Sequence, residues 1–225
     1  MGQDPLGAGS PLRTPRAAAV AGILFSVLMI TALTLLRLSV PPSPAVAGTW
    51  LTDPGHRAAV AVGLNLVPFA GIAFLWFVGV LRDRIGERED RFFATVFLGS
   101  GLLFVAMIFV GAAAAGAGVA SATLSQHPAS GTLVLDRDLT TSLLNVYSMR
   151  MAAVFTLTTV TIARRTRIVA RWLTLAGVVC AVVLLVGIGI SPWVELLFPV
   201  WILALSLDIL SAGPAVPSAQ RLAEP

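Results

Sequence analysis

Six long apolar runs alternate with short polar segments along this chain of 225 residues. The runs lie near the ~20 residues that a helix needs to cross the hydrocarbon of a bilayer. The pattern therefore predicts an all-α fold, in which six membrane spans form one helix bundle over residues 17–212. The expected spans are residues 17–36, 57–81, 93–120, 141–163, 172–190 and 192–210.

Polar segments flank this bundle and its spans. Residues 1–16 and 213–225 are rich in Pro, Ala and Gly, and we expect both to be disordered cytoplasmic tails. Before the second span, Asp53 and Pro54 are typical of the N-cap and the first position of a helix. An Ala-Val-Ala motif at residues 45–47 leaves open the alternative that the first span is cleaved as a secretory signal. The span is longer than the ~7–15 apolar residues of a signal, which favours its retention.

The composition supports a membrane location. Hydrophobic residues make up 57% of the chain and charged residues only 12%, whereas soluble domains carry about 25% charged residues. The net charge of +4 comes from residues at the ends of the apolar runs, which is the membrane pattern. We therefore expect the lipid bilayer as the partner and no binding of nucleic acid.

The placement of arginine predicts the orientation. The segment Arg82–Arg91 carries eight charged residues between two apolar runs, so it must lie in water. If this segment is cytoplasmic, eleven arginines lie in cytoplasmic segments, against Arg37, Arg57 and Arg137 in outer ones. The eleven are Arg13, Arg16, Arg82, Arg84, Arg88, Arg91, Arg164, Arg165, Arg167, Arg171 and Arg221. Because basic residues accumulate on the cytoplasmic side, we expect both termini there and a multi-pass protein of the cytoplasmic membrane.

Arg150 is the arginine that falls inside an expected span, about nine residues or ~13 Å from the start of the span. An ionisable group at that depth is a functional candidate by default. Small and polar residues share one face of this helix, and Arg150 lies on the opposite face. The residues on the shared face are Thr141, Asn145, Ser148, Ala152, Thr156 and Thr159. Polar groups on both sides predict that protein surrounds this helix at the bundle centre.

Glu195, Asn65 and Asn145 are expected in the same outer half of the membrane as Arg150. In one interpretation the four residues form an outward-facing polar pocket, where Arg150 binds an anionic solute or lipid headgroup and Glu195 is its resting counter-ion. In the other, Arg150 reaches the headgroups or is clamped by Glu195 as a structural pair. The structural interpretation is favoured, because arginine can reach the interface from that depth.

Two further polar groups are expected on the cytoplasmic side. Asp208 is a second candidate for a functional site, on a proton or cation path, although pairing with Arg164 or Arg165 is the favoured interpretation. Arg164, Arg165, Arg167 and Arg171 form a cluster that should attract anionic lipid headgroups, at about 1 kcal/mol per residue. We interpret this cluster as an anchor to the membrane surface.

Catalytic motifs are absent from the sequence. It contains no H-E-x-x-H, G-x-S-x-G, Walker A or C-x-x-C motif. Acidic and histidine side chains in two outer loops could gather a metal ion, but their spacing is no ligand motif. These residues are Asp53, His56, His127, Asp136 and Asp138. We therefore expect no enzymatic activity, no cofactor and no metal.

One segment resembles a known group of proteins. The sequence of residues 65–101, NLVPFAGIAFLWFVGVLRDRIGEREDRFFATVFLGSG, resembles a stretch found in small integral membrane proteins of high-GC actinobacteria. The resemblance implies a membrane location and topology. It implies no activity and no site residues.

Small residues fill the second half of the third span, with the sequence GAAAAGAG at residues 111–118. Small residues four positions apart let a neighbouring helix approach closely. We therefore expect self-association or docking of a partner membrane subunit through such faces. The favoured function is a non-enzymatic structural or accessory component of the membrane. The alternative is a small transporter or channel that uses the polar pocket around Arg150.

Overall fold

The computed structural model describes residues 14–39, 53–85, 91–124, 138–166, 169–187, 191 and 193–211. These residues are helical apart from short connections, so the all-α fold class is confirmed. The elements are α1 (Thr14–Ser39), α2 (Pro54–Ile85), α3 (Arg91–Leu124), the π-helical turn η3 (Ser142–Tyr147), α5 (Ser148–Thr166), α6 (Arg171–Val186), the 3-10 turn η4 (Val194–Leu196) and α7 (Leu197–Ser211). Five helical segments of this described part are long and apolar enough to cross a membrane.

The first three helices extend beyond the expected spans. The first was expected at residues 17–36 and is observed at Thr14–Ser39, and the third was expected at residues 93–120 and is observed at Arg91–Leu124. Hydropathy marks the hydrocarbon, but helical hydrogen bonding continues into the polar flanks. The predicted start of the second helix is confirmed, since the backbone N–H of Gly55 donates to Oδ1 of Asp53 at 2.7 Å. Both predicted tails, apart from residues 14–16, and the Ala-Val-Ala motif lie outside the described residues.

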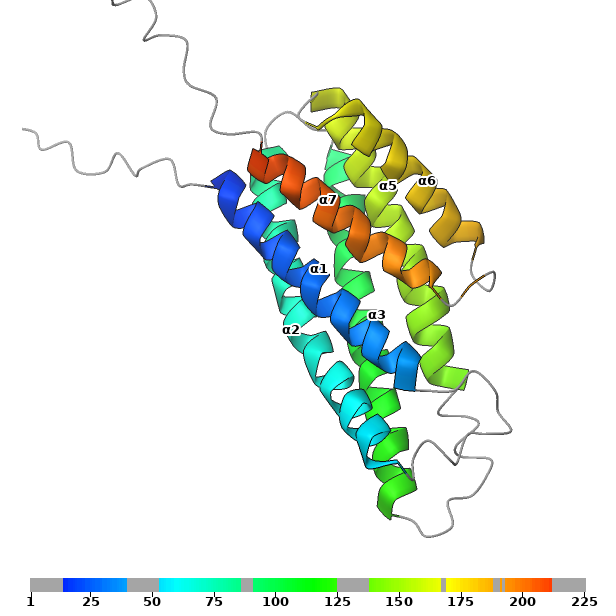
Figure 1. Ribbon diagram of the computed structural model, residues 1–225. Coiled ribbons are helices and arrows are strands. Elements are labelled where there is room, and N and C mark those ends of the chain that lie inside the picture. The colour runs from blue at the N-terminus through cyan, green and yellow to red at the C-terminus, as the bar shows by residue number, and fades with distance from the viewer. Residues whose placement is uncertain are drawn as a thin grey trace, which may run out of the picture.

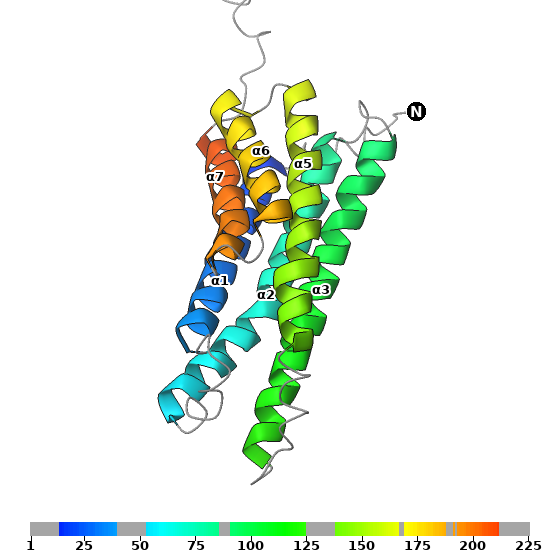
Figure 2. The same ribbon diagram turned by 90° about the vertical axis from the view of Figure 1, so that its right-hand side faces the viewer.

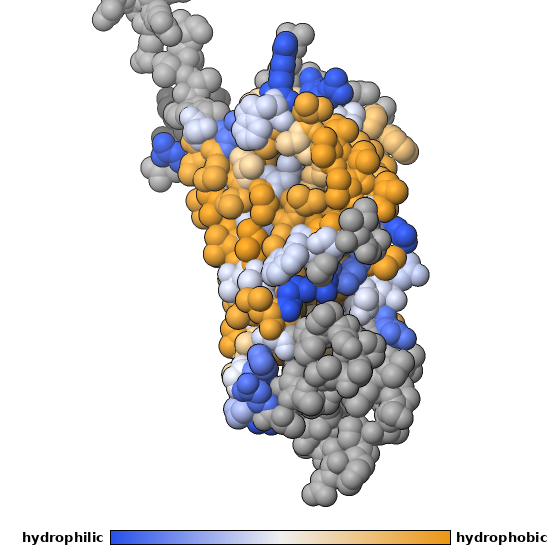
Figure 3. Space-filling view, turned by 45° about the vertical axis from the view of Figure 1, so that its right-hand side comes forward, coloured by the Kyte–Doolittle hydropathy of each residue, from blue (hydrophilic) through white to orange (hydrophobic). Residues whose placement is uncertain are grey.

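The helices pack as a ring in which each contacts its neighbours. α2 lies between α1 and α3, α5 follows α3, and α6 and α7 complete the ring back to α1. In Figure 1 the start of α1 and the end of α7 lie at the same end of the bundle, hereafter the N-terminal end. Figure 3 shows a broad hydrophobic band around the visible face, with hydrophilic residues above and below it. Such a band is typical of a membrane protein.

α6 is shorter than the other helices of the ring. It has 16 residues, which rise about 24 Å, less than the ~30 Å of a hydrocarbon core. Figure 2 shows that α6 and α7 cover only part of the length of α3 and α5. The span expected at residues 172–190 is therefore observed as a shorter apolar helix, and six complete crossings stay a prediction.

A cluster of phenylalanine rings forms the centre of the bundle. α1, α2, α3, α5 and α7 each contribute one ring, and each ring is at most 1% exposed. The five residues are Phe25, Phe74, Phe104, Phe155 and Phe198. Ring centroids lie 4.8 Å apart for Phe25 and Phe74 and 4.9 Å apart for Phe104 and Phe198. Tilted and edge-to-face contacts at such distances are favourable for aromatic pairs, so these rings hold five helices together.

Glycine permits the closest helix contacts. A Cβ atom added at Gly22 of α1 would lie 2.1 Å from Oγ of Ser206 on α7 and 2.9 Å from Phe77 on α2. At Gly111 of α3, an added Cβ would lie 2.7 Å from the side chain of Leu144 in η3. The close approach predicted for the small-residue segment is therefore observed at its first residue.

Candidate functional site

A charged pair joins the end of α1 to the start of α7. Arg37 lies in the last turn of α1, and Glu195 lies in η4, immediately before α7. Each charge also suits its own helix, since the macrodipole favours a cation at a C-terminus and an anion at an N-terminus. α1 and α7 pack against each other and run in opposite directions (Figure 1). The C-terminal end of α1 and the N-terminal end of α7 therefore meet on the side of the bundle away from the start of α1.

The pair is direct and largely sheltered. Nη2 of Arg37 donates a hydrogen bond to Oε1 of Glu195 and forms a salt bridge with it. The Glu195 side chain is 9% exposed and that of Arg37 30% exposed. Charge-assisted bonds of this kind are strong, and an unpaired carboxylate in such surroundings would be costly. The contact thus neutralises two charges within an apolar bundle.

Of the interpretations of Arg150, the pairing with Glu195 is contradicted, because Glu195 has Arg37 as its partner. That Arg150 reaches the lipid headgroups stays a prediction. Arg150 is exposed on the outside of α5. The sequence pattern placed Arg37 in an outer loop, since the apolar run ends at Leu36. The structure continues α1 to Ser39, and the added turn carries Arg37 to α7.

The later part of the polar face predicted for the helix around Arg150 faces inward, whereas Thr141 at its start is exposed. Ser148, Thr156 and Thr159 are buried, and each hydroxyl donates to the carbonyl four residues earlier. Hydroxyls bonded in this way allow close packing and leave no donor unsatisfied. The further expectation that protein surrounds this helix is wrong, because the side with Arg150 and Leu157 is exposed.

The two asparagines of the predicted pocket lie on other surfaces. Asn65 is exposed on α2, and its Nδ2 donates to the carbonyl of Ala61 at 2.8 Å. Asn145 is half-buried in η3. Within the described residues, no hydrogen bond joins either amide to Arg150 or Glu195. The four predicted residues are therefore not brought together by hydrogen bonds.

Asp208 lies beside the start of α6. Its Oδ2 is 3.5 Å from the backbone N–H of Ala170, the N-cap residue of α6. A carboxylate at this position is stabilised by the helix N-terminus. Asp208 thus lies next to the expected basic segment, but its observed contact is with the backbone of that segment and not with an arginine side chain. Arg164 and Arg171 are exposed, while the side chain of Arg165 and all of Arg167 lie outside the described part.

The acidic and histidine residues of the two outer loops, for which no metal site was expected, are only partly described by the structure. Nδ1 of His56 lies 3.4 Å from Oδ2 of Asp53, and Asp138 is exposed in the first turn of its helix. His127 and Asp136 lie outside the described residues. Among the residues that are described, no three His, Cys, Asp or Glu side chains are grouped as metal ligands.

In the Arg37–Glu195 pair, the guanidinium and the carboxylate bind each other. Its chemistry is that of a structural contact between helix ends, because the guanidinium is a permanent cation and the carboxylate already accepts its hydrogen bond. Sequence reasoning missed Arg37, and the available signal was a lone arginine within one helical turn of an apolar run.

Comparisons of the chain with protein-family models, curated proteins and solved structures found no significant match.

Proposed function

We propose that this multi-pass protein is a non-enzymatic structural or accessory component of the cytoplasmic membrane. In this proposal its outer helix faces associate with a second copy or with another membrane subunit. The five long apolar helices support the membrane location. The structural role is supported by how the interior and the exterior of the bundle are built.

The phenylalanine cluster is the observation that carries the proposal. Five buried rings, one from each of five helices, are in contact with one another inside the bundle. They occupy the place that a solute path through the bundle would need. Protein interiors packed in this way have few voids as large as a water molecule, so the interior favours a packed scaffold over a channel.

The buried hydroxyl groups support the same conclusion. Eight of them, among the described residues, donate to the backbone carbonyl four residues earlier on their own helix. They are Ser26, Ser100, Ser148, Thr156, Thr158, Thr159, Thr174 and Ser206. A transport site needs polar groups that point to a solute. These groups point their hydrogens at their own helices.

The exterior of α3 supports a docking role. Ala113 and Ala117 are exposed, and a Cβ atom added at Gly116 would meet no atom within 4 Å. These three positions share one helix face through their spacing of three and four residues. A face of small residues allows a second membrane helix to approach closely.

Cross-linking tests the docking role. Ala117→Cys is introduced into a Cys180→Ala background, and membranes are treated with a short thiol cross-linker. We expect a cross-linked product with a second copy or with another membrane protein. Leu157→Cys is the matched control, because residue 157 is exposed on α5, and it should give little product.

Transport is the competing outcome. Purified protein in proteoliposomes should give no anion flux above empty vesicles. Anion flux that Arg150→Gln abolishes, in a variant that still folds, would contradict the proposal and support the transporter alternative. A lack of any cross-linked product at residue 117 in native membranes would also contradict it.

A further inference from the structure

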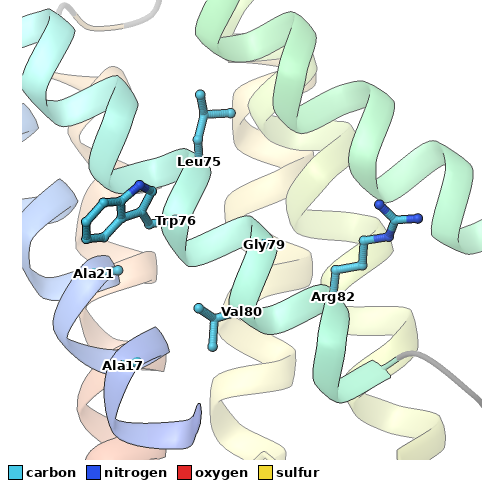
Figure 4. A pocket seen from close by; sticks show the side chains of 7 residues that line it. All are labelled: Ala17, Ala21, Leu75, Trp76, Gly79, Val80 and Arg82. Atoms are coloured by element: carbon cyan, nitrogen blue, oxygen red, sulfur yellow. The ribbon is translucent and has the colours of Figure 1, made fainter. Parts of the chain in front are cut away.

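A shallow groove lies between α1 and the last turns of α2, at the N-terminal end of the bundle (Figure 4). Its volume is about 400 Å³. Ala17 and Ala21 of α1 form one wall, and Trp76, Gly79 and Val80 of α2 form the other. In Figure 4 the Trp76 ring leans over α1 beside Ala21. The groove is thus a largely apolar furrow on the outside of the bundle.

Small residues create this furrow. The side chains of Ala17 and Ala21 are too short to fill the space, and an added Cβ at Gly79 would meet no atom within 4 Å. The residue directly after Ala21, Gly22, is packed so tightly against Phe77 that a Cβ would clash. α1 and α2 are therefore in close contact along one line and leave an open furrow beside it. Trp76, 70% exposed, forms its rim.

Two arginines lie at one end of the furrow. Arg16 begins the apolar segment of α1, and Arg82 ends that of α2. α1 starts at the end of the bundle where α2 finishes, so both mark the same membrane boundary (Figure 1). Both are exposed, and neither has an ion pair or hydrogen bond with another described residue. Trp76 precedes Arg82 by about six residues, which places it ~9 Å deeper.

We propose that this furrow binds one anionic phospholipid. Its phosphate lies between Arg16 and Arg82, and one acyl chain lies along Trp76 and Gly79. Arginine favours phosphate because it donates several hydrogen bonds to it. The apolar walls fit a lipid chain and give a free phosphate ion nothing to bind.

One rearrangement accompanies binding. In Figure 4 the Arg82 side chain extends away from Ala17, so its contact with a phosphate requires a change of rotamer. Exposed side chains change rotamer within nanoseconds. The site is independent of the docking role proposed for α3, because it uses other helices and another surface.

Quenching of tryptophan fluorescence by brominated lipid tests the proposal. The protein, in a Trp172→Phe background, is reconstituted in phosphatidylcholine vesicles. A minor fraction of the lipid is replaced by brominated phosphatidylglycerol or, in a matched sample, by brominated phosphatidylcholine. The readout is the part of the quenching that depends on Trp76, obtained as the difference between the protein with and without the Trp76→Phe substitution. We expect this Trp76-dependent quenching to be several-fold stronger with the anionic lipid.

Matched variants locate the effect. Gly79→Leu fills the furrow and should remove the preference, whereas Gly99→Leu, also in open space, should retain it. Arg16→Gln and Arg82→Gln should each remove most of the several-fold preference, because one basic residue near an anionic surface contributes ~1 kcal/mol, a factor of about five. Arg164→Gln removes an exposed arginine outside the furrow and should leave the preference unchanged.

Three results would overturn the proposal. Equal Trp76-dependent quenching by both brominated lipids would show that the furrow does not select charge. A preference that persists in a folded Gly79→Leu variant would place the lipid elsewhere. Displacement by millimolar inorganic phosphate would show that the arginines take the anion alone. If Gly79→Leu fails to fold, the comparison of the two furrow arginine variants with Arg164→Gln decides. A preference that neither Arg16→Gln nor Arg82→Gln lowers below that of Arg164→Gln would then overturn the proposal.

Discussion

At the scale of single residues, the Arg37–Glu195 contact fixes where two helix ends lie. Glu195 is sheltered and Arg37 only partly so. An arginine that loses its carboxylate can extend toward water, whereas a buried carboxylate that loses its arginine cannot. The pair is therefore asymmetric, and Glu195 depends on Arg37 more than Arg37 depends on Glu195.

This asymmetry gives a prediction. Arg37→Gln should destabilise the protein more than Glu195→Gln, because it leaves the carboxylate without its cation. Both losses should stay below the ~3–5 kcal/mol found when a fully buried pair is broken, since Arg37 is 30% exposed. Thermal unfolding in detergent, or resistance to protease, measures the order of the variants.

The control is Arg57→Gln, which removes an exposed arginine from the first turn of α2. An Arg37→Gln variant as stable as this control would show that the contact has no structural role. The exchanged pair, Arg37→Glu with Glu195→Arg, should recover only part of the loss. Each exchanged charge would oppose its helix macrodipole, by about 0.3–1 kcal/mol.

The partner of Glu195 could not be deduced from the sequence, whereas the inward face of α5 could. Spacing along one helix fixes which residues share a face, and Ser148, Thr156 and Thr159 are buried together as predicted. Which helix ends become neighbours is decided by packing of the whole ring. Arg37 and Glu195 are separated by 158 residues in the chain, and no local pattern relates them.

At the scale of elements, α1 makes close contacts with α2 and α7 through Gly22. Lipid removes most of the hydrophobic drive for helices to associate, so van der Waals contact carries more of the stability. Contacts that depend on a missing side chain are then sensitive to a single methyl group. Gly22 meets Ser206 on one side and Phe77 on the other.

Gly22→Ala should therefore destabilise the bundle by about 1–3 kcal/mol, the usual cost of overpacking. Gly99→Ala is the matched control, because its added methyl group meets open space. The control should be neutral or stabilising by up to ~1 kcal/mol, since alanine is the better helix former. Thermal unfolding of both variants in the same detergent checks the difference. Equal stability would contradict the tight contact.

Hydropathy predicted the existence of the helices better than their detailed form. Membrane spans are readable because apolar length and backbone bonding both require a helix. η3 was not predicted, since the π-helical turn at Ser142–Tyr147 has no period that hydropathy detects. The early end of α6 at Val186 was missed for a related reason, because the residues after it are still apolar.

At the scale of the whole molecule, the arrangement has one consequence for threading through the membrane. The start of α1 and the end of α7 lie at the same end of the bundle (Figure 1). That end also carries the exposed arginines Arg16, Arg82, Arg164 and Arg171. Since basic residues accumulate on the cytoplasmic side, this end is expected in the cytoplasm.

Cysteine labelling of intact cells tests this threading in a Cys180→Ala background. Gly86→Cys lies between α2 and α3 and should be protected from a membrane-impermeant maleimide until the cells are opened. Ser191→Cys lies between α6 and α7 and should be labelled from outside if α6 crosses the membrane despite its 16 residues. A short helix can cross where the bilayer thins locally around it, at a cost of fractions of a kcal/mol per Å of mismatch.

Labelling of residue 86 in intact cells would show that the orientation is the reverse of the one expected. Protection of residue 191 together with residue 86 would show instead that α6 and α7 form a hairpin that does not reach the outer surface.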